Sequence, residues 1–176
     1  DVDQMVLSIN PQATVNAGVD ATICEGSTYT LSTAVATDAT SLLWTTSGTG
    51  TFDDATILAA TYTPSPADIT AGSVTLTLTA QSAAPCVEAT DAMVLSISLQ
   101  ATADAGVDAT ICEGSTYTLS TAVATNAASI LWTTSGTGTF SSTIVQNPVY
   151  TPSQNDIDDG SVILTMTVTS AAPCAG

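Results

Sequence analysis

The sequence predicts an all-β protein built from two β-sandwich domains in tandem, and three observations lead to this prediction. The chain repeats itself with a period of 88 residues, so that the segment Ala17–Thr37 returns letter for letter as Ala105–Thr125. Apolar and polar residues alternate over short stretches, as half-buried antiparallel strands require. Turn-forming residues separate these stretches about every 8 to 12 residues. A period this long indicates one folding unit per repeat.

The clearest strand is predicted at residues 74–79, where Val74, Leu76 and Leu78 point to one face and threonines point to the other. Its counterpart is residues 162–167, and further strands are expected at residues 29–31, 42–46, 61–63 and 93–97. No stretch combines the period of a helix with capping residues, so we expect no helix. About seven short antiparallel strands per repeat favour a sandwich.

The phase of the repeat predicts where each domain begins. Residues 3–10 (DQMVLSIN) align with residues 91–98 (DAMVLSIS). Residues 1–10 are therefore expected to be the closing strand of a preceding repeat, residues 11–98 the first repeat, and residues 99–176 a second repeat without its closing strand. Two explanations remain open: a window of a longer array, or a short subunit that polymerises by donor-strand exchange.

The composition excludes several functions. The chain has 16 acidic residues and no Lys, Arg or His, which gives a formal charge of −16. Such a chain repels nucleic acids and anionic membranes, so we expect neither nucleic-acid binding nor membrane insertion. It also lacks a histidine base, a lysine nucleophile and a cationic oxyanion stabiliser, and we therefore expect no enzymatic activity. Disorder is not expected, because 44% of the residues are hydrophobic.

Four cysteines form two pairs with the same spacing, Cys24 with Cys86 and Cys112 with Cys174. One even pair per repeat predicts one disulfide per domain in an oxidising, extracellular setting. The alternatives are buried free thiols or, more weakly, a zinc site, which the spacing does not support.

One tryptophan and one tyrosine recur in each repeat as candidate core residues: Trp44, Tyr62, Trp132 and Tyr150. An aromatic residue on the most apolar strand of a sandwich fills the space between the sheets, although a sugar-stacking platform is the alternative. The tyrosine hydroxyls need a hydrogen-bond partner, for which a turn carbonyl is the candidate.

No cofactor is expected, but carboxylates that persist in both repeats are weak calcium candidates: Asp20, Glu25 and Asp68, with their counterparts Asp108, Glu113 and Asp156. The alternative is that these side chains cap helices or stabilise turns. The denser pair Asp53 and Asp54 becomes Ser141 and Ser142 in the second repeat, so it is not a site that every repeat needs.

Several motifs occur in both repeats: AG-x-D-x-x-IC-x-G, WTTSGTGTF, YTPS-x-x-DI-x-x-GS and a late PC. Together they resemble the immunoglobulin-like, PKD-like repeats of giant cell-surface adhesins in gliding bacteria of the Bacteroidetes type, which the type IX route secretes. The resemblance implies tandem immunoglobulin-like sandwiches in an extracellular filament that serves adhesion and gliding motility. Its implied partners are neighbouring repeats of the same chain and other copies of the filament.

An alternative function is binding of a surface polysaccharide. The segment of residues 53–61 differs most strongly from its counterpart, residues 141–149. A surface loop tolerates such change, so Asp53, Asp54, Ser141 and Ser142 are the candidate ligand-loop residues.

Overall fold

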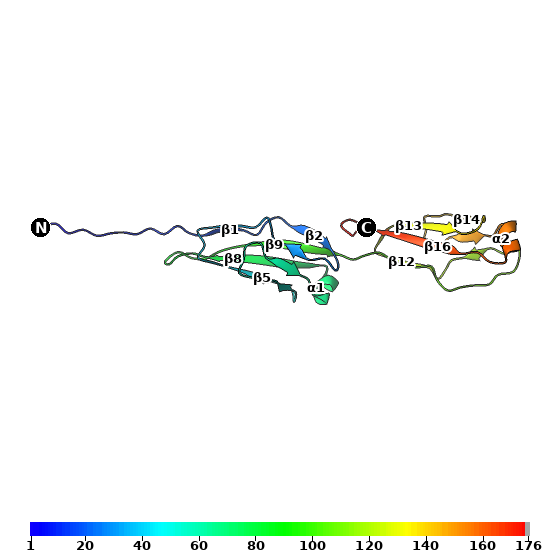
Figure 1. Ribbon diagram of the computed structural model, residues 1–176, viewed down its shortest axis with the longest axis horizontal. Coiled ribbons are helices and arrows are strands. Elements are labelled where there is room, and N and C mark those ends of the chain that lie inside the picture. The colour runs from blue at the N-terminus through cyan, green and yellow to red at the C-terminus, as the bar shows by residue number, and fades with distance from the viewer. Residues whose placement is uncertain (175–176) are drawn as a thin grey trace. The chain divides into compact units, whose positions relative to one another are not determined.

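The computed structural model describes residues 1–174 and is predominantly β-structure. The chain divides into two compact units, residues 1–98 (unit 1) and residues 99–176 (unit 2). Each unit has its own hydrophobic core, which packs around one of the two tryptophans. Figure 1 shows the order of the elements along the chain.

Unit 1 is a sandwich whose main sheet has the strand order β2-β9-β8-β5. A three-stranded sheet, β3-β7-β6, and the pair β1-β4 complete the unit. The strands are β1 (Thr14–Asn16), β2 (Ala21–Cys24), β3 (Tyr29–Thr30), β4 (Val35–Thr37), β5 (Ser41–Thr46), β6 (Thr51–Phe52), β7 (Thr61–Thr63), β8 (Ser73–Gln81) and β9 (Ala89–Ser98).

The central strand β8 has the predicted alternation. Val74, Leu76 and Leu78 are buried in the core, while Thr75 and Thr77 lie half-buried on the opposite face. The neighbouring strand β9 alternates in the same way, so both strands contribute one apolar face to the core between the sheets.

One pairing differs from the expected antiparallel arrangement, because β2 runs parallel to β9. Strand β1 pairs with β4. After β1 the chain crosses to the main sheet at Gly18, whose φ of +98° lies in the left-handed region. The backbone N–H of Ala17 donates to Asp91 of β9 at 2.8 Å, which guides the chain onto that strand. The main sheet is therefore mixed.

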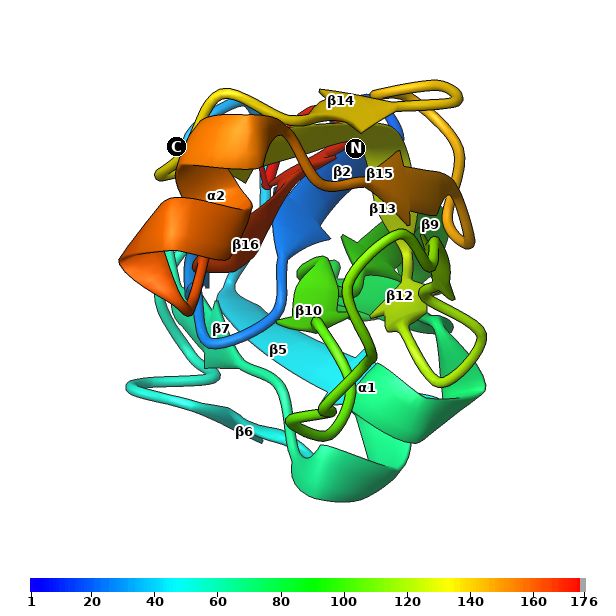
Figure 2. The ribbon, with the colours of Figure 1, turned by 90° about the vertical axis from the view of Figure 1, so that its right-hand side faces the viewer.

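Two short helices correct the expectation that the chain has none (Figure 2). They are α1 (Pro66–Ala71) in unit 1 and α2 (Gln154–Asp159) in unit 2. Each begins with a capping box, in which Ser65 or Ser153 accepts from the backbone of an aspartate three residues later. Each ends at a glycine in the left-handed conformation, Gly72 or Gly160. A helix of six residues is too short to show a hydrophobic period.

Unit 2 repeats this plan with a smaller main sheet, the pair β13-β16. Its other strands form the pair β10-β12 and the sheet β11-β15-β14. The strands are β10 (Thr102–Asp104), β11 (Tyr117–Thr118), β12 (Val123–Thr125), β13 (Ala127–Thr134), β14 (Thr139–Phe140), β15 (Val149–Thr151) and β16 (Leu164–Ser170). Within residues 99–174, no strand corresponds to β2 or β9 of unit 1.

Residues 1–10 precede the folded part of unit 1 and form no strand (Figure 1). Their apolar side chains are exposed: Val2, Met5, Val6, Leu7 and Ile9. The segment has the sequence of a closing strand without the structure of one.

Candidate functional site

A buried aspartate organises the same cluster in each unit. In unit 1, the carboxylate of Asp68 accepts from the backbone N–H groups of Thr49 at 2.9 Å, Gly50 at 2.9 Å and Ser65 at 2.9 Å. The hydroxyl of Tyr62 donates to the same carboxylate at 2.8 Å. Asp68 therefore joins the β5–β6 turn, strand β7 and the start of α1.

Asp156 does the same in unit 2, where it accepts from Thr137 at 2.8 Å, Gly138 at 3.0 Å and Ser153 at 3.1 Å. The hydroxyl of Tyr150 donates to it at 2.7 Å. The tyrosine partner is thus a carboxylate in both units, rather than the turn carbonyl that the sequence indicated.

These hydrogen bonds control the ionisation of both aspartates. Burial would raise the pKa of Asp68, but donation from Ser65, Thr49 and Tyr62 outweighs it and lowers the pKa to about 2. The hydroxyl of Tyr150 and the backbone of Thr137 lower the pKa of Asp156 to about 2 against the effect of burial. Both groups are carboxylates at neutral pH and act as fixed hydrogen-bond acceptors.

The glycines of the repeated SGTG motif leave room for this cluster. A Cβ atom on Gly48 would overlap the carboxylate of Asp68, and one on Gly50 would overlap the hydroxyl of Tyr62. Gly136 and Gly138 have the same surroundings in unit 2. The motif therefore serves the fold.

The tryptophans lie in the cores and do not form sugar-binding surfaces. Trp44 is 2% exposed and Trp132 is 1% exposed. Their indole N–H groups donate to backbone carbonyls, that of Leu58 at 3.2 Å and that of Val145 at 3.1 Å. With no exposed ring face, neither residue can stack on a sugar.

The cysteine pairing differs from the prediction of one disulfide within each repeat. Cys24 and Cys174 are disulfide-bonded, whereas their expected partners Cys86 and Cys112 are free thiols, so neither predicted pair is formed. In unit 1, Cys24 ends β2 opposite Ser98, whereas Cys86 follows β8 at the other end of the main sheet. Strands rise about 3.3 Å per residue, so β8 separates these two cysteines far beyond the reach of a disulfide.

The weak calcium candidates do not form a common site. Within residues 1–174, no three acidic or cysteine side chains gather closely enough to hold a metal ion. Asp68 and Asp156 are the capping carboxylates described above, and Asp20 accepts from the backbone N–H of Val94 at 2.8 Å. Glu25 follows Cys24 and donates its backbone N–H to Ser98. Asp108 and Glu113 lie exposed in unit 2.

The candidate ligand-loop residues close their own loops. Asp53 accepts from the backbone N–H of Thr61 at 2.7 Å, and in unit 2 Ser141 accepts from Val149 at 3.0 Å. The hydrogen bonds from the backbone N–H groups of Thr61 and Asp54 lower the pKa of Asp53. Asp54 and Ser142 accept from the backbone two residues later, at 2.8 Å and 3.4 Å. A carboxylate in unit 1 and a hydroxyl in unit 2 thus accept equivalent backbone hydrogen bonds.

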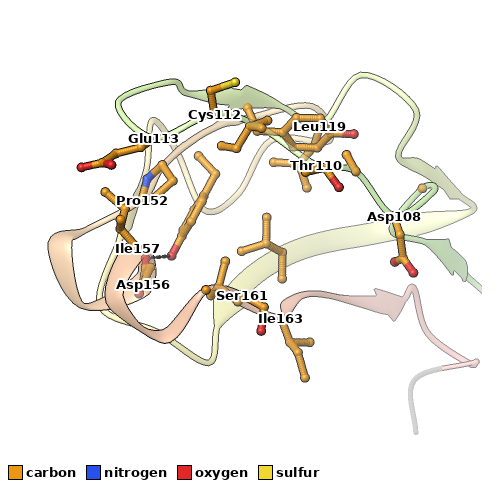
Figure 3. Close-up of a pocket in the computed structure, with 18 of the residues that line it drawn as sticks. Asp108, Thr110, Cys112, Glu113, Leu119, Pro152, Asp156, Ile157, Ser161 and Ile163 are labelled. Atoms are coloured by element: carbon orange, nitrogen blue, oxygen red, sulfur yellow. Dashed lines mark hydrogen bonds between the residues drawn. The ribbon is translucent and has the colours of Figure 1, made fainter.

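Unit 2 contains a groove that the sequence analysis did not predict. It has a volume of about 680 Å³ and lies between residues 105–114 and residues 160–164. Figure 3 shows Thr110 and Cys112 on one side of it and Ser161 and Ile163 on the other. Asp156, bonded to Tyr150, lines its end near Pro152.

The chain matches no protein-family model and no curated protein sequence. Among the described residues, no helix has the length and apolar character needed to cross a membrane.

Proposed function

We propose that this chain is a structural module, a spacer in the stalk of a secreted cell-surface adhesin filament. The observation that carries the proposal is that the most distinctive residues shared by both repeats serve the fold. The Asp68 and Asp156 clusters and the turn glycines have equivalent partners in both units, and both tryptophans are buried. A repeat in which these shared residues stabilise the fold is suited to supply length.

The composition supports a role outside the cell and away from other polyanions. With a formal charge of −16 and no cationic side chain, the chain relies on burial and backbone hydrogen bonds for its stability. The disulfide-bonded state of Cys24 and Cys174 is compatible with an oxidising compartment. Export to the surface, adhesion and gliding motility follow from the resemblance to adhesin repeats and belong to the same proposal.

Immunogold electron microscopy on intact cells of the source organism tests this proposal. Antibodies raised against residues 11–98 should label extended fibres on the outer surface without permeabilisation. Labelling confined to the cell interior would contradict the spacer role.

A glycan array separates a spacer from a polysaccharide-binding module. The spacer role predicts no saturable binding by the wild-type chain. A matched variant carries residues 141–149 in place of residues 53–61, and it should behave identically. Saturable binding that this loop exchange abolishes would instead assign a ligand site to residues 53–61.

A further inference from the structure

We propose that the outer face of the main sheet is a docking surface, through which two copies of this chain associate sheet against sheet. The outer face is the side of the sheet that points away from the core. Its central residues are Leu43, Thr45, Thr75, Thr77, Thr79 and Val94. This inference goes beyond the spacer role, because it concerns how separate chains contact each other.

Strand pairing arranges the outward side chains of β5, β8 and β9 in rows (Figure 1). The core-facing positions of these strands are buried or half-buried, so the alternate positions point outward. Thr77 lies between Thr45 of β5 and Ala92 of β9. In the next row, Thr79 pairs with Leu43. The three strands therefore form one continuous surface.

This surface carries no charge, although the chain has 16 acidic residues. No outward position of β5, β8 or β9 is Asp or Glu. Asp91 of β9 points to the opposite side of the sheet and accepts from the backbone N–H of Ala17. At the margin of the face, Asp20 accepts from the backbone N–H of Val94 at 2.8 Å. The carboxylates near the face are thus turned away from it or held at its edge.

Exposed apolar side chains lie within the same surface. Leu43 is 48% exposed and Val94 is 38% exposed. The threonines around them add methyl groups and uncharged hydroxyls. Contact with a matching surface would remove these apolar groups from water, which favours association.

Unit 2 has an equivalent surface on β13 and β16. Leu131 pairs with Thr167 and Thr133 pairs with Thr165, which repeats the two rows of unit 1. Leu131 is 48% exposed, as is its counterpart Leu43. The strands β13 and β16 contain no acidic residue. Each chain therefore carries the docking surface twice.

The charge distribution selects a second copy as the partner. Two chains with a charge of −16 repel each other wherever their carboxylates meet, so an uncharged surface is where they can approach closely. A strongly charged partner would find no opposite charge on this face. The same face of another copy offers a matching uncharged surface, and a two-fold axis gives a self-complementary contact between sheets about 10 Å apart.

The size of the face predicts a weak contact. Three strands about 4.8 Å apart cover roughly 300 Å² in each copy. A pair of faces then buries roughly 600 Å², below the roughly 1,200 Å² of a stable interface. We expect a dissociation constant of about 1 mM for one pair of faces, and repetition of the face along a chain increases the avidity.

Sedimentation equilibrium of the full chain tests this association. The average mass should rise between about 0.05 and about 2 mM protein. Association should strengthen when the salt concentration rises from about 0.02 to about 0.5 M, because screening reduces the repulsion between the copies.

A pair of charge variants tests which surface is used. Leu43→Asp combined with Leu131→Asp places a charge on both faces and should weaken association at least about 10-fold. Val35→Asp combined with Val123→Asp is the matched control. These valines are 55% and 46% exposed, and they lie in β4 and β12, outside the main sheets. The control adds the same charge and should change association by less than about threefold.

A disulfide trap tests the face without adding charge. In a background with Cys86→Ser and Cys112→Ser, Thr77→Cys places a thiol at the centre of the face. Under mild oxidation, this variant should form covalent dimers at least about 10 times faster than Val35→Cys in the same background. Peptide mapping identifies the bonded positions.

Four results would overturn the proposal: a wild-type chain that stays monomeric up to about 2 mM, association that weakens with salt, equal association of the two charge variants, or equal crosslinking rates. A monomeric chain that binds an uncharged polysaccharide through Leu43 would assign the face to a glycan instead. A chain that is monomeric and binds no glycan leaves the spacer role intact, because immunogold labelling tests that role separately.

Discussion

Asp68 and Asp156 show how one residue can stabilise a fold that has no salt bridges between side chains. Each carboxylate accepts three backbone N–H groups and a tyrosine hydroxyl from segments up to 19 residues away in the sequence. Hydrogen bonds to a charged group are stronger than those between neutral groups. A negative residue thus acts as the local organising centre in a chain without cations.

Replacing Asp68 should therefore destabilise unit 1 strongly. Asp68→Ala leaves four donors without their acceptor, and we expect a loss of about 3 kcal/mol in the free energy of unfolding. Urea denaturation followed by tryptophan fluorescence measures this loss.

Asp53→Ser is the matched control for that measurement. It removes the same charge, but Ser141 already makes the equivalent bond in unit 2. The control should change the stability by less than about 0.5 kcal/mol. Equal effects of the two substitutions would show that charge, rather than the buried network, decides the stability.

The lowered pKa values of Asp68 and Asp156 predict a specific dependence of stability on pH. Both carboxyls have a pKa of about 2 in the folded state, below the ordinary value of about 3.9. Their contribution is complete above about pH 4 and is lost as the pH falls towards 2. Protonation of exposed carboxylates acts oppositely, because it relieves repulsion in a chain with a charge of −16.

The free energy of unfolding should thus rise slightly from pH 7 to about pH 4 and then decrease towards pH 2. Denaturation series at several pH values test this profile. A stability that continues to rise down to pH 2 would contradict the assigned role of these two carboxylates.

At the scale of elements, the sequence predicted the strongly alternating strands and missed the short, locally determined segments. Residues 61–63 form β7 as expected, and residues 74–79 lie inside β8. The helices α1 and α2 were missed because six residues show no period, although Ser65 followed by Asp68 and later by Gly72 was a readable capping signal. Strands as short as β1 and β4 have too few residues to alternate visibly.

The cluster at the candidate site was also only partly predictable. The repeated SGTG and YTPS motifs indicated structural turns, and the persistence of Asp68 as Asp156 indicated a shared role. What joins them is a set of contacts between segments far apart in the chain, which the sequence does not encode locally. For the same reason, the spacing of Cys24 and Cys86 could not reveal that they lie at opposite ends of one sheet.

The unpaired edge of β16 predicts weaker protection from amide exchange in unit 2. Strand β8 is paired on both sides, by β9 and β5, whereas β16 is paired with β13 alone. Every second amide of β16 should exchange with solvent at least about 100-fold faster than its counterpart in β8.

Amide exchange measured by NMR tests this expectation, and the strands β5 and β13 provide the control. Each lies at an edge of its main sheet, so their amides should exchange at similar rates. Equal protection of β8 and β16 would show that the open edge is covered in solution.

At the scale of the whole molecule, the four cysteines fall into two chemical classes. Alkylation before reduction should label Cys86 and Cys112 and leave Cys24 and Cys174 unmodified, because only the first two are thiols. Mass spectrometry of the digested chain measures the labels. Protection of Cys86 or Cys112 instead would restore the original expectation of one disulfide per repeat.

The parallel neighbours β2 and β9 lie near the beginning and the end of unit 1. When the ends of the unit are pulled apart, tension at the start of β2 and at the end of β9 acts along these strands in opposite directions. The hydrogen bonds between them are then loaded in shear, so they must break together and not one after another. This parallel pair therefore makes unit 1 resistant to mechanical extension.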